Sequence, residues 1–359
     1  MAEDKITVTI GGQEYAGWKE VRITRDVRNC AADFELSVSE RWAGNDQPWQ
    51  IKPFDPCTIS LDGELLLTGY VEVYNPSFDA TSHGVRIAGR SKTCDIVDCM
   101  PEIPGGEFTN YTLDKIAKAI CGPFGINVVV APGTDLGGPI PNATLEKAET
   151  GYAFLEKLCG LQGVLAFDDE KGNLVLAQAG TAGTAGALVQ GENILAAGAH
   201  LTSNHRFKQY IVLSQAPLAY DEQDAQLEVV GKATDNGCPR FRRFAEMSAD
   251  PADTARATLR AKWRAAHNFG EATQAGIMVQ GFRQAGGDLW KINQMAPVKA
   301  PYLAIDQQLM IGAVTLMLSE EGRRTDLMLA PQEAFTTQPP KAKKPKGGGT
   351  SSLWSGNLG

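Results

Sequence analysis

Apolar and polar residues alternate with a period of two along the first hundred residues, which is typical of strands that bury one face. Residues 6–10 read Ile-Thr-Val-Thr-Ile, and the Gly-Gly pair that follows them suits a two-residue hairpin turn. The same alternation returns over 32–39, 59–73 and 85–87. About six antiparallel strands at this spacing are typical of a small barrel or sandwich. We therefore expect residues 1–103 to form a first tube-like β-barrel.

An amphipathic helical period then replaces this alternation. Apolar residues spaced for one helix face predict a helix that Thr112 caps and Gly122 ends. Thr150 and Gly163 bound a second predicted helix, and a predicted hairpin follows over 164–176. The expected boundaries are 104–179 for a compact α/β module and 180–190 for a Gly-rich flexible linker.

Strand patterning resumes after Gly191 and is interrupted once by a helix, which Asp250 can cap with Pro251 at its first position. We expect residues 191–335 to form a second tube-like β-barrel with this helix at 251–269. The pattern leaves open whether 191–250 belongs to this barrel or forms a separate small domain. The strands of this region are predicted at 210–214, 226–230, 277–279, 289–292, 309–311, 314–318 and 327–329.

The two strand-rich regions resemble each other. The first region contains an apolar run around Gly69, followed by a polar turn and a second run that begins at Val85. The second region repeats this order, with an apolar run around Gly312, a polar turn and a run that begins at Leu327. The offset is 243 residues for the glycines and 242 for the second pair. This match predicts an internal duplication. The expected fold class is therefore mainly β with an α+β insertion, in which two similar antiparallel β-barrel domains flank a small α/β module.

The charge balance disfavours a dedicated nucleic-acid binder. The formal net charge is −8, and the last 24 residues hold four Lys and no acidic residue, which leaves −12 on the rest of the chain. No secretory signal opens the sequence, and no apolar run reaches the roughly 18 residues of a membrane helix. The seven scattered cysteines are interpreted as reduced, buried thiols rather than a disulfide framework.

The basic C-terminal tail, residues 336–359, has a composition that cannot bury a core. It combines a Lys- and Pro-rich stretch with an apolar Leu-Trp pair near its end. Two interpretations remain open: a disordered tail, or an arm that orders on a partner. In the second case the candidate partner-binding residues are Lys341, Lys343, Lys344, Lys346 and Trp354.

Catalytic motifs are missing from the sequence. It contains no His-Glu-x-x-His, Gly-x-Ser-x-Gly or phosphate-binding Gly-x4-Gly-Lys-Ser/Thr pattern, and its four His are dispersed. Acidic clusters at 168–170, 221–224 and 320–321 fall in predicted turns, and we interpret them as solvated turns rather than as acid/base pairs. No catalytic, cofactor-binding or metal-binding residue is therefore predicted.

A series of segments, in this order, resembles a known family. The carrying segments are Thr150–Gly163 running into Gly172–Leu176, then Gly191–Leu195, Gly287–Trp290 and Leu327–Phe335. They are similar to the baseplate hub proteins of contractile-tailed phages, specifically the Mu-like tail protein P group. The T-even hub and the head of type VI secretion spikes are more distant relatives. The resemblance spans nearly all of residues 1–335.

This resemblance implies a structural protein and not an enzyme. In the family, two similar barrels per chain assemble as a homotrimer, and the ring joins a six-fold tail tube to a three-fold spike. The implied partners are the tail tube protein, the central spike protein and other baseplate and tail-tip proteins. DNA would pass through the channel without specific binding, which an acidic wall favours.

The implied location is the baseplate of the virion tail, after synthesis in the bacterial host cytoplasm, with no cofactor and no membrane segment. Two alternatives remain. The chain could be a spike-head component of a type VI-like or tailocin injection machine. Less favoured is a tail-tip peptidoglycan hydrolase, which would need two carboxylates facing each other across a cleft.

Overall fold

The computed structural model describes residues 5–39, 51–79, 83–215, 228–248 and 254–336. Its main feature is one 13-stranded sheet, which contains strands from both the N-terminal and the C-terminal part of the chain. Seven strands from the N-terminal part of the chain contribute a first β-domain to this sheet. They are β1 (Ile6–Ile10), β2 (Gln13–Tyr15), β3 (Glu20–Asp26), β4 (Asp33–Ser39), β5 (Pro56–Leu61), β6 (Glu64–Phe78) and β7 (His83–Ser91).

The α/β module follows the first β-domain and has its own hydrophobic core. Thr150 caps one of its helices, since its hydroxyl oxygen accepts a hydrogen bond from the Ala153 N–H at 3.3 Å, and Gly163 ends that helix in the left-handed conformation. Ile96 belongs to the same core, so the module begins before the expected residue 104. Its elements are α1 (Cys94–Asp98), β8 (Glu107–Tyr111), α2 (Leu113–Cys121), η1 (Gly122–Phe124), β9 (Val128–Val130), β10 (Ile140–Thr144), α3 (Gly151–Gln162), β11 (Leu165–Asp168) and β12 (Leu174–Ala177).

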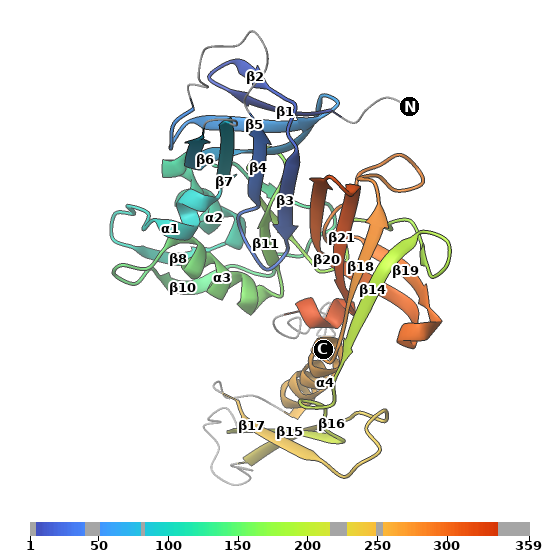
Figure 1. The fold of residues 1–359 in the computed structure, drawn as a ribbon. Coiled ribbons are helices and arrows are strands. Elements are labelled where there is room, and N and C mark those ends of the chain that lie inside the picture. Colours follow the sequence, from blue (N-terminus) through green and yellow to red (C-terminus); the bar gives the residue numbers. More distant parts are fainter. Residues whose placement is uncertain (1–4, 40–50, 80–82, 216–227, 249–253, 337–359) are drawn as a thin grey trace, which may run out of the picture.

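A small third unit answers the question left open for residues 191–250. A three-stranded sheet packs on one helix around a separate core that includes Tyr210 and Ala261, and Figure 1 shows it apart from the large sheet. Gly231 permits close packing, because a Cβ there would lie 2.0 Å from the Ala257 carbonyl carbon. The elements are β15 (Gln209–Gln215), β16 (Glu228–Thr234), β17 (Arg243–Met247) and α4 (Thr254–Glu271).

The second β-domain repeats the strand order of the first. The sequence of neighbours β3-β4-β7-β6-β5 in the first domain corresponds to β14-β18-β21-β20-β19 in the second, with every neighbouring pair antiparallel. The mainly β fold with two similar domains is confirmed. The elements of the second domain are β13 (Leu188–Val189), β14 (Ile194–Leu201), β18 (Thr273–Gln280), β19 (Met295–Ala300), η2 (Pro301–Leu303), β20 (Ile305–Ser319), β21 (Gly322–Ala330) and η3 (Gln332–Phe335).

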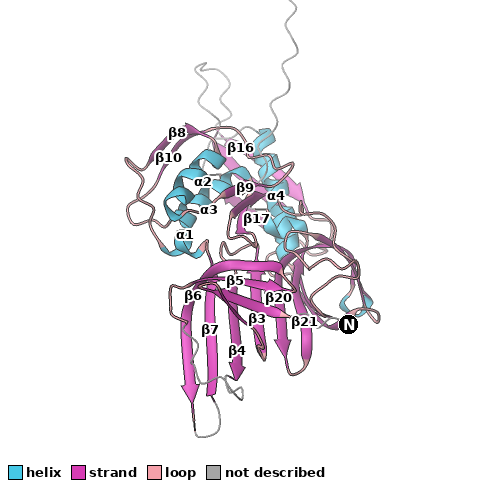
Figure 2. Cartoon of the chain, turned by 90° about the horizontal axis from the view of Figure 1, so that it is seen from above, coloured by secondary structure: helices cyan, strands magenta, loops and turns pink. Residues whose placement is uncertain are grey.

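The two β-domains join edge to edge. Strand β20 uses one edge for β21, and its other edge is divided between β19 over residues 305–310 and β3 over 313–318. Figure 2 shows β7, β4, β3, β20 and β21 side by side in this continuous sheet. One hydrophobic core spans both domains and includes Leu36 and Leu327, both fully buried. The repeats are therefore halves of one sheet.

Local details differ from the sequence expectations. The Gly-rich residues 180–190 are not a flexible linker, because Asn293 accepts a hydrogen bond from the Gly180 N–H at 2.6 Å, and β13 pairs with β19. No strand forms at 289–292, where Leu289 makes only an isolated bridge. Both long hairpins contain a β-bulge, after Val71 and after Ile311. These bulges lie 240 residues apart, so equivalent residues of the two repeats differ by 240 in number. The sequence alignment of Gly69 with Gly312, at an offset of 243, was therefore wrong by three residues.

Candidate assembly site

A buried ion pair joins the first β-domain to the α/β module. The Arg25 Nε lies 3.1 Å from Asp168 Oδ1, and the Asp168 side chain is fully buried. Arg25 Nη2 also donates to the backbone carbonyl of Leu66 at 3.2 Å. Burial by itself lowers the pKa of Arg25, but the charge and hydrogen bond of Asp168, with the charges of Glu170 and Asp169, outweigh it and raise that pKa. Asp168 is therefore held in a buried ion pair and is not part of a solvated turn.

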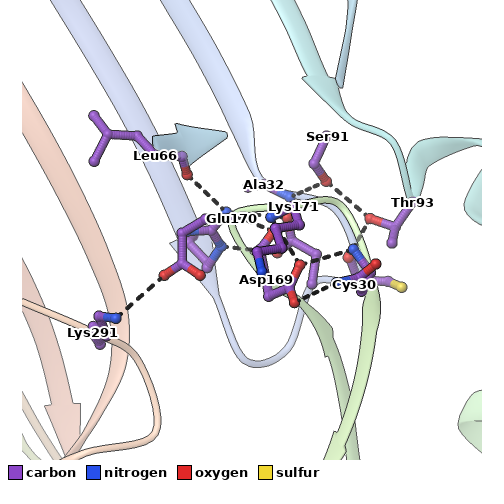
Figure 3. Close-up of polar contacts among 12 residues, drawn as sticks. Cys30, Ala32, Leu66, Ser91, Thr93, Asp169, Glu170, Lys171 and Lys291 are labelled. Carbon is purple, nitrogen blue, oxygen red and sulfur yellow. Dashed lines mark hydrogen bonds and ion pairs between the residues drawn. The ribbon is translucent and has the colours of Figure 1, made fainter. Parts of the chain in front are cut away.

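The turn after Asp168 touches both β-domains. Thr68 of the first domain donates its hydroxyl proton to the Glu170 carbonyl oxygen at 3.0 Å. Lys291 of the second domain lies with its Nζ 3.8 Å from Glu170 Oε1, and Figure 3 shows these two side chains pointing toward each other. The Asp169 side chain holds the turn by accepting hydrogen bonds from the N–H groups of Lys171 and Asn173, both at 2.9 Å. This turn thus fixes the module at the junction.

A buried chain of hydroxyl groups supports the same junction (Figure 3). The Ser91 and Thr93 hydroxyl oxygens lie 2.9 Å apart, and Thr93 donates to the Cys30 carbonyl oxygen at 2.7 Å. Ser91 Oγ accepts from the Ala32 N–H at 3.1 Å. Since both hydroxyl residues are fully buried, these bonds compensate for their desolvation and fix the start of the module against the segment that leads into β4.

A cavity of about 220 Å³ lies where the first β-domain, the second β-domain and the α/β module meet. Its walls include Ile23 and Leu316 of the joined strands, Phe167 of the module, and Trp290. The Trp290 indole N–H is buried and has no hydrogen-bond partner among the described residues. Apart from the Arg25–Asp168 pair and its turn, the walls are mainly apolar.

The reactive side chains are dispersed. No group of three or more His, Cys, Asp or Glu residues among the described ranges is placed to hold a metal ion. All seven cysteines are free, and six are buried as expected, but Cys99 is exposed. Burial raises the pKa of the Cys57 and Cys121 thiols to about 12.

Two edges of the large sheet have no partner strand within the part of the chain that the structure describes. Strand β14 pairs only with β18. Strand β6 pairs with β5 over residues 64–70, but from Val73 to Phe78 it pairs only with β7. Unpaired edges present backbone donors and acceptors to any further strand.

The residues predicted to bind partners, Lys341, Lys343, Lys344, Lys346 and Trp354, lie outside the described residues, as does the acidic cluster at 221–224. Sequence reasoning missed the two strand edges and the Arg25–Asp168 pair. The edges had a signal that could have been used, since 73–78 and 194–201 contain no charged residue. The ion pair had no local signal, because 143 residues separate its partners.

The same architecture occurs in solved structures of tail proteins. The 43 kDa tail protein of prophage MuSo2 from Shewanella oneidensis superposes with a TM-score of 0.82 at 28% identity, covering 93% of this chain and 99% of that chain. The E. coli c3393 protein, a type VI secretion system component, shares the fold with a TM-score of 0.56 at 10% identity, over 90% of this chain and 76% of that chain. The fold therefore defines a tail protein of the Mu-like class.

Sequence comparison specifies the family. Residues 5–91 match the N-terminal part of the Mu phage baseplate assembly protein GpP-like family, 93–178 match the second domain of the gp44-like baseplate hub proteins, and 253–338 match the fourth domain of GpP. Baseplate hub protein gp44 of Escherichia phage Mu is 30% identical over 355 residues, which are 96% of this chain and 93% of that protein. The chain belongs to the family of Mu-like phage baseplate hub proteins, and its location is the tail baseplate of the virion. No helix within the described ranges is long and apolar enough to span a membrane.

Proposed function

We propose that three copies of this chain form the hub ring of the baseplate, which adapts the six-fold tail tube to the three-fold spike. The observation that carries this proposal is the repeated strand order of the two β-domains. A trimer of a chain with two equivalent domains presents six similar faces on one side while keeping three-fold symmetry on the other. The tail tube protein, the spike protein and other baseplate and tail-tip proteins are the proposed partners.

The hub ring surrounds the passage for DNA in this proposal and does not bind DNA specifically. The net charge of −8 supports this, because a negative wall repels the phosphate backbone. The test is retention on a DNA column at low salt, where we expect the chain to elute in the void. Retention that falls steeply with salt would contradict a passive channel.

Assembly is tested by the mass of the purified protein, measured by light scattering behind a sizing column with and without the spike protein. We expect about three times 38.5 kDa, either for the protein alone or after the spike is added. A monomer that is indifferent to the spike would contradict the proposal.

The hub acts without catalysis in this proposal. Asp168, a buried carboxylate in the wall of the cavity, is engaged by Arg25 at 3.1 Å, so it is held in a structural ion pair. Release of soluble fragments from purified cell walls by the protein would reinstate the hydrolase alternative.

A spike head of a type VI-like or tailocin injection machine is the second candidate, favoured by the shared fold of the E. coli c3393 protein. Co-purification with the tube and spike proteins of either machine separates the two, because each hub should retain only its own partners.

The C-terminal tail, residues 336–359, is proposed as a partner-binding arm. Its four Lys and Trp354 offer positive charge and one large apolar side chain. Removing residues 337–359 should weaken binding of the spike or tube protein without changing the mass of the hub. Unchanged binding would contradict the arm.

A further inference from the structure

We propose that the cavity between the two β-domains and the α/β module is a binding site for a compact, uncharged and largely apolar molecule with one hydrogen-bond acceptor. The indole N–H of Trp290 donates to that acceptor. The cavity lies within a single copy of the chain. The site therefore does not depend on the proposed trimer and is a property of the chain separate from assembly.

The volume of the cavity suits a molecule of two fused rings. It measures about 220 Å³, whereas protein interiors contain few voids larger than a water molecule. An apolar cavity of about 150 Å³ stays dry and takes up benzene. The cavity in this chain has about half as much volume again, which is enough for a second ring.

Apolar side chains from all three parts form most of the wall. They are Ile23 and Leu66 of the first β-domain, Phe167 and Val175 of the module, and Val314 and Leu316 of the second β-domain. Transfer of an apolar molecule from water into such surroundings is favourable, roughly in proportion to the apolar area that leaves water. The wall therefore selects a ligand whose surface is mostly hydrocarbon.

The polar side chains of the wall already have partners, with one exception among the described residues. Arg25 pairs with Asp168 at 3.1 Å, and the Lys291 Nζ lies 3.8 Å from a Glu170 carboxylate oxygen. Both ends of the Asn293 side-chain amide form hydrogen bonds with the backbone. These groups are engaged within the protein and do not call for a ligand.

Trp290 is the exception and supplies the directional contact. The residue is 6% exposed, and its Nε1 is buried with no hydrogen-bond partner in the part of the chain that the structure describes. Buried donors are almost always paired in proteins, and a donor that stays unpaired lowers stability. A ligand that places an acceptor against this N–H removes that loss.

The charges of the wall disfavour an ionic ligand. Three consecutive acidic residues, 168–170, stand against two basic residues, Arg25 and Lys291. A carboxylate or phosphate would meet this acidic excess, and an ammonium group would leave the Trp290 N–H without an acceptor. Because burying an unpaired charge is costly, an uncharged molecule fits the cavity best.

The segment that carries Trp290 is held in place on both sides. Before it, the Gln284 side-chain amide donates to the Leu289 carbonyl oxygen at 3.1 Å. After it, the Asn293 N–H donates to the Ile311 carbonyl oxygen at 2.8 Å. The indole ring is therefore fixed in the wall before a ligand arrives, which lowers the entropic cost of binding.

Exposed wall residues mark the entrance of the cavity. Thr181, Ala182 and Lys291 are exposed, whereas Phe167 and Trp290 are buried. A ligand reaches the cavity from the side of the exposed residues. Ala182 is the position at which a larger side chain should obstruct it.

Quinoline and naphthalene test the site in the full-length protein. Both compounds have two fused rings, but only quinoline has a ring nitrogen that accepts a hydrogen bond, and it is uncharged at pH 8. Equilibrium dialysis measures the dissociation constant of each compound. We expect saturable binding of one quinoline molecule per chain.

The variant Trp290→Phe removes the donor and keeps an aromatic ring. The two compounds also differ in their transfer out of water, so the quantity to compare is the ratio of their dissociation constants in each protein. The preference for quinoline over naphthalene should fall about three- to tenfold in this variant, which corresponds to the loss of one hydrogen bond. An unchanged ratio would show that Trp290 donates to no ligand and would overturn the inference.

A substitution at the entrance provides a second test that leaves Trp290 in place. We expect Ala182→Phe to weaken quinoline binding at least tenfold. The matched control is Ala187→Phe, because Ala187 is also exposed in the Gly-rich residues 180–190 but does not line this cavity. The control should bind quinoline like the wild type, and equal weakening in both variants would contradict this location. Circular dichroism shows whether each variant has folded.

The outcomes separate this inference from the proposed function. A folded wild-type protein that binds neither compound, as expected if water fills the cavity, overturns the site and leaves the trimeric hub in place. A monomer that ignores the spike but binds quinoline through Trp290 supports the site and contradicts the hub.

Discussion

Arg25 and Asp168 are separated by 143 residues and form a buried ion pair at the point where the first β-domain, the α/β module and the cavity meet. Arg25 lies on β3, opposite Val314 of β20. The same strand therefore joins the two β-domains through its backbone and holds the module through a side chain. Several of the following predictions concern this junction.

Asp168→Asn should destabilise the protein by about 3–5 kcal/mol, because it leaves the buried Arg25 charge without its carboxylate partner. Urea unfolding followed by circular dichroism measures this. Glu35→Gln, which breaks the exposed Arg86–Glu35 pair, should lower the midpoint far less, because exposed ion pairs contribute little to stability. The double variant Arg25→Met with Asp168→Leu should recover most of the loss. Equal destabilisation of the single and double variants would show that the unpaired charge is not the cause.

Gly69→Ala should destabilise the first β-domain by roughly 1–3 kcal/mol or more. A Cβ at Gly69 would lie 2.0 Å from the Arg90 carbonyl oxygen, so the backbone of β7 would have to move. The matched control is Gly276→Ala in β18, where a Cβ meets nothing within 4 Å. This control should gain about 0.5 kcal/mol. Thermal unfolding measures both, and equal melting temperatures would contradict the close approach of β6 and β7.

Thiol labelling at pH 8 should modify one cysteine per chain rapidly. Cys99 is exposed and the other six are buried. Burial also raises the pKa of the Cys57, Cys121 and Cys159 thiols to about 12, so almost none of each is the reactive thiolate. The Cys99→Ser variant should show no rapid phase. Rapid labelling of two or more cysteines per folded chain would contradict this burial.

Asn293→Ala should expose the Gly-rich segment 180–186 to proteases. Asn293 is buried, accepts from the Gly180 N–H at 2.6 Å and donates to the Gln178 carbonyl oxygen at 3.0 Å. Limited digestion with elastase, which cleaves after small residues, should then cut near this segment. The exposed Asn142→Ala is the control and should be cut no faster than the wild type. Resistance of Asn293→Ala would mean that other contacts suffice to hold the segment.

Two acidic residues, Asp26 and Glu35, should contribute to the pH dependence of stability with opposite signs, because their pKa values are shifted in opposite directions. Burial raises the pKa of Asp26 above its ordinary value, despite the hydrogen bond from the Arg28 N–H. The folded state therefore binds that proton more tightly, and this group lowers stability as pH rises from about 4 through its folded pKa. Asp26→Asn should remove this loss and gain stability relative to wild type between pH 4 and pH 7.

Glu35 has the opposite sign. A hydrogen bond from Arg86 lowers the pKa of Glu35, so its contribution is present above the unfolded pKa and is lost as pH falls. Glu35→Gln should therefore lose stability relative to wild type as pH rises from below the folded pKa of Glu35 to about pH 4.5, and the difference should stay constant above that. Unfolding midpoints at pH 3, 4, 5.5 and 7 compare the variants. Parallel curves for Asp26→Asn and Glu35→Gln would contradict these assignments.

Periodicity predicted most elements because it reports which face of an element is buried. Thr150 and Gly163 marked the ends of α3 correctly, since a cap and a left-handed residue are local requirements of a helix end. The α4 helix was placed well, but the pattern did not identify its buried face, where Ala257 and Ala261 pack on the small sheet. Close packing against Gly231 selects small residues, which a hydrophobicity pattern does not favour.

The assembly site could be predicted only in part. The repeat indicated two equivalent domains, but it did not reveal that β3 pairs with β20, because the register of strands 287 or more residues apart depends on where the bulges fall. Asp168 was assigned to a solvated turn for a similar reason. Its partner, Arg25, lies on a strand far away in the sequence, and only the folded chain brings the two together.

The division of the β20 edge between β19 and β3 has a mechanical consequence. Six residue pairs join β20 of the second domain to β3 of the first in an antiparallel ladder. A force along these strands is perpendicular to the hydrogen bonds of the ladder, so it must break many of them at once instead of one after another. The two domains of a chain therefore behave as a single stiff arc. In the proposed ring, any bending that the baseplate undergoes would then be taken up at the contacts between chains.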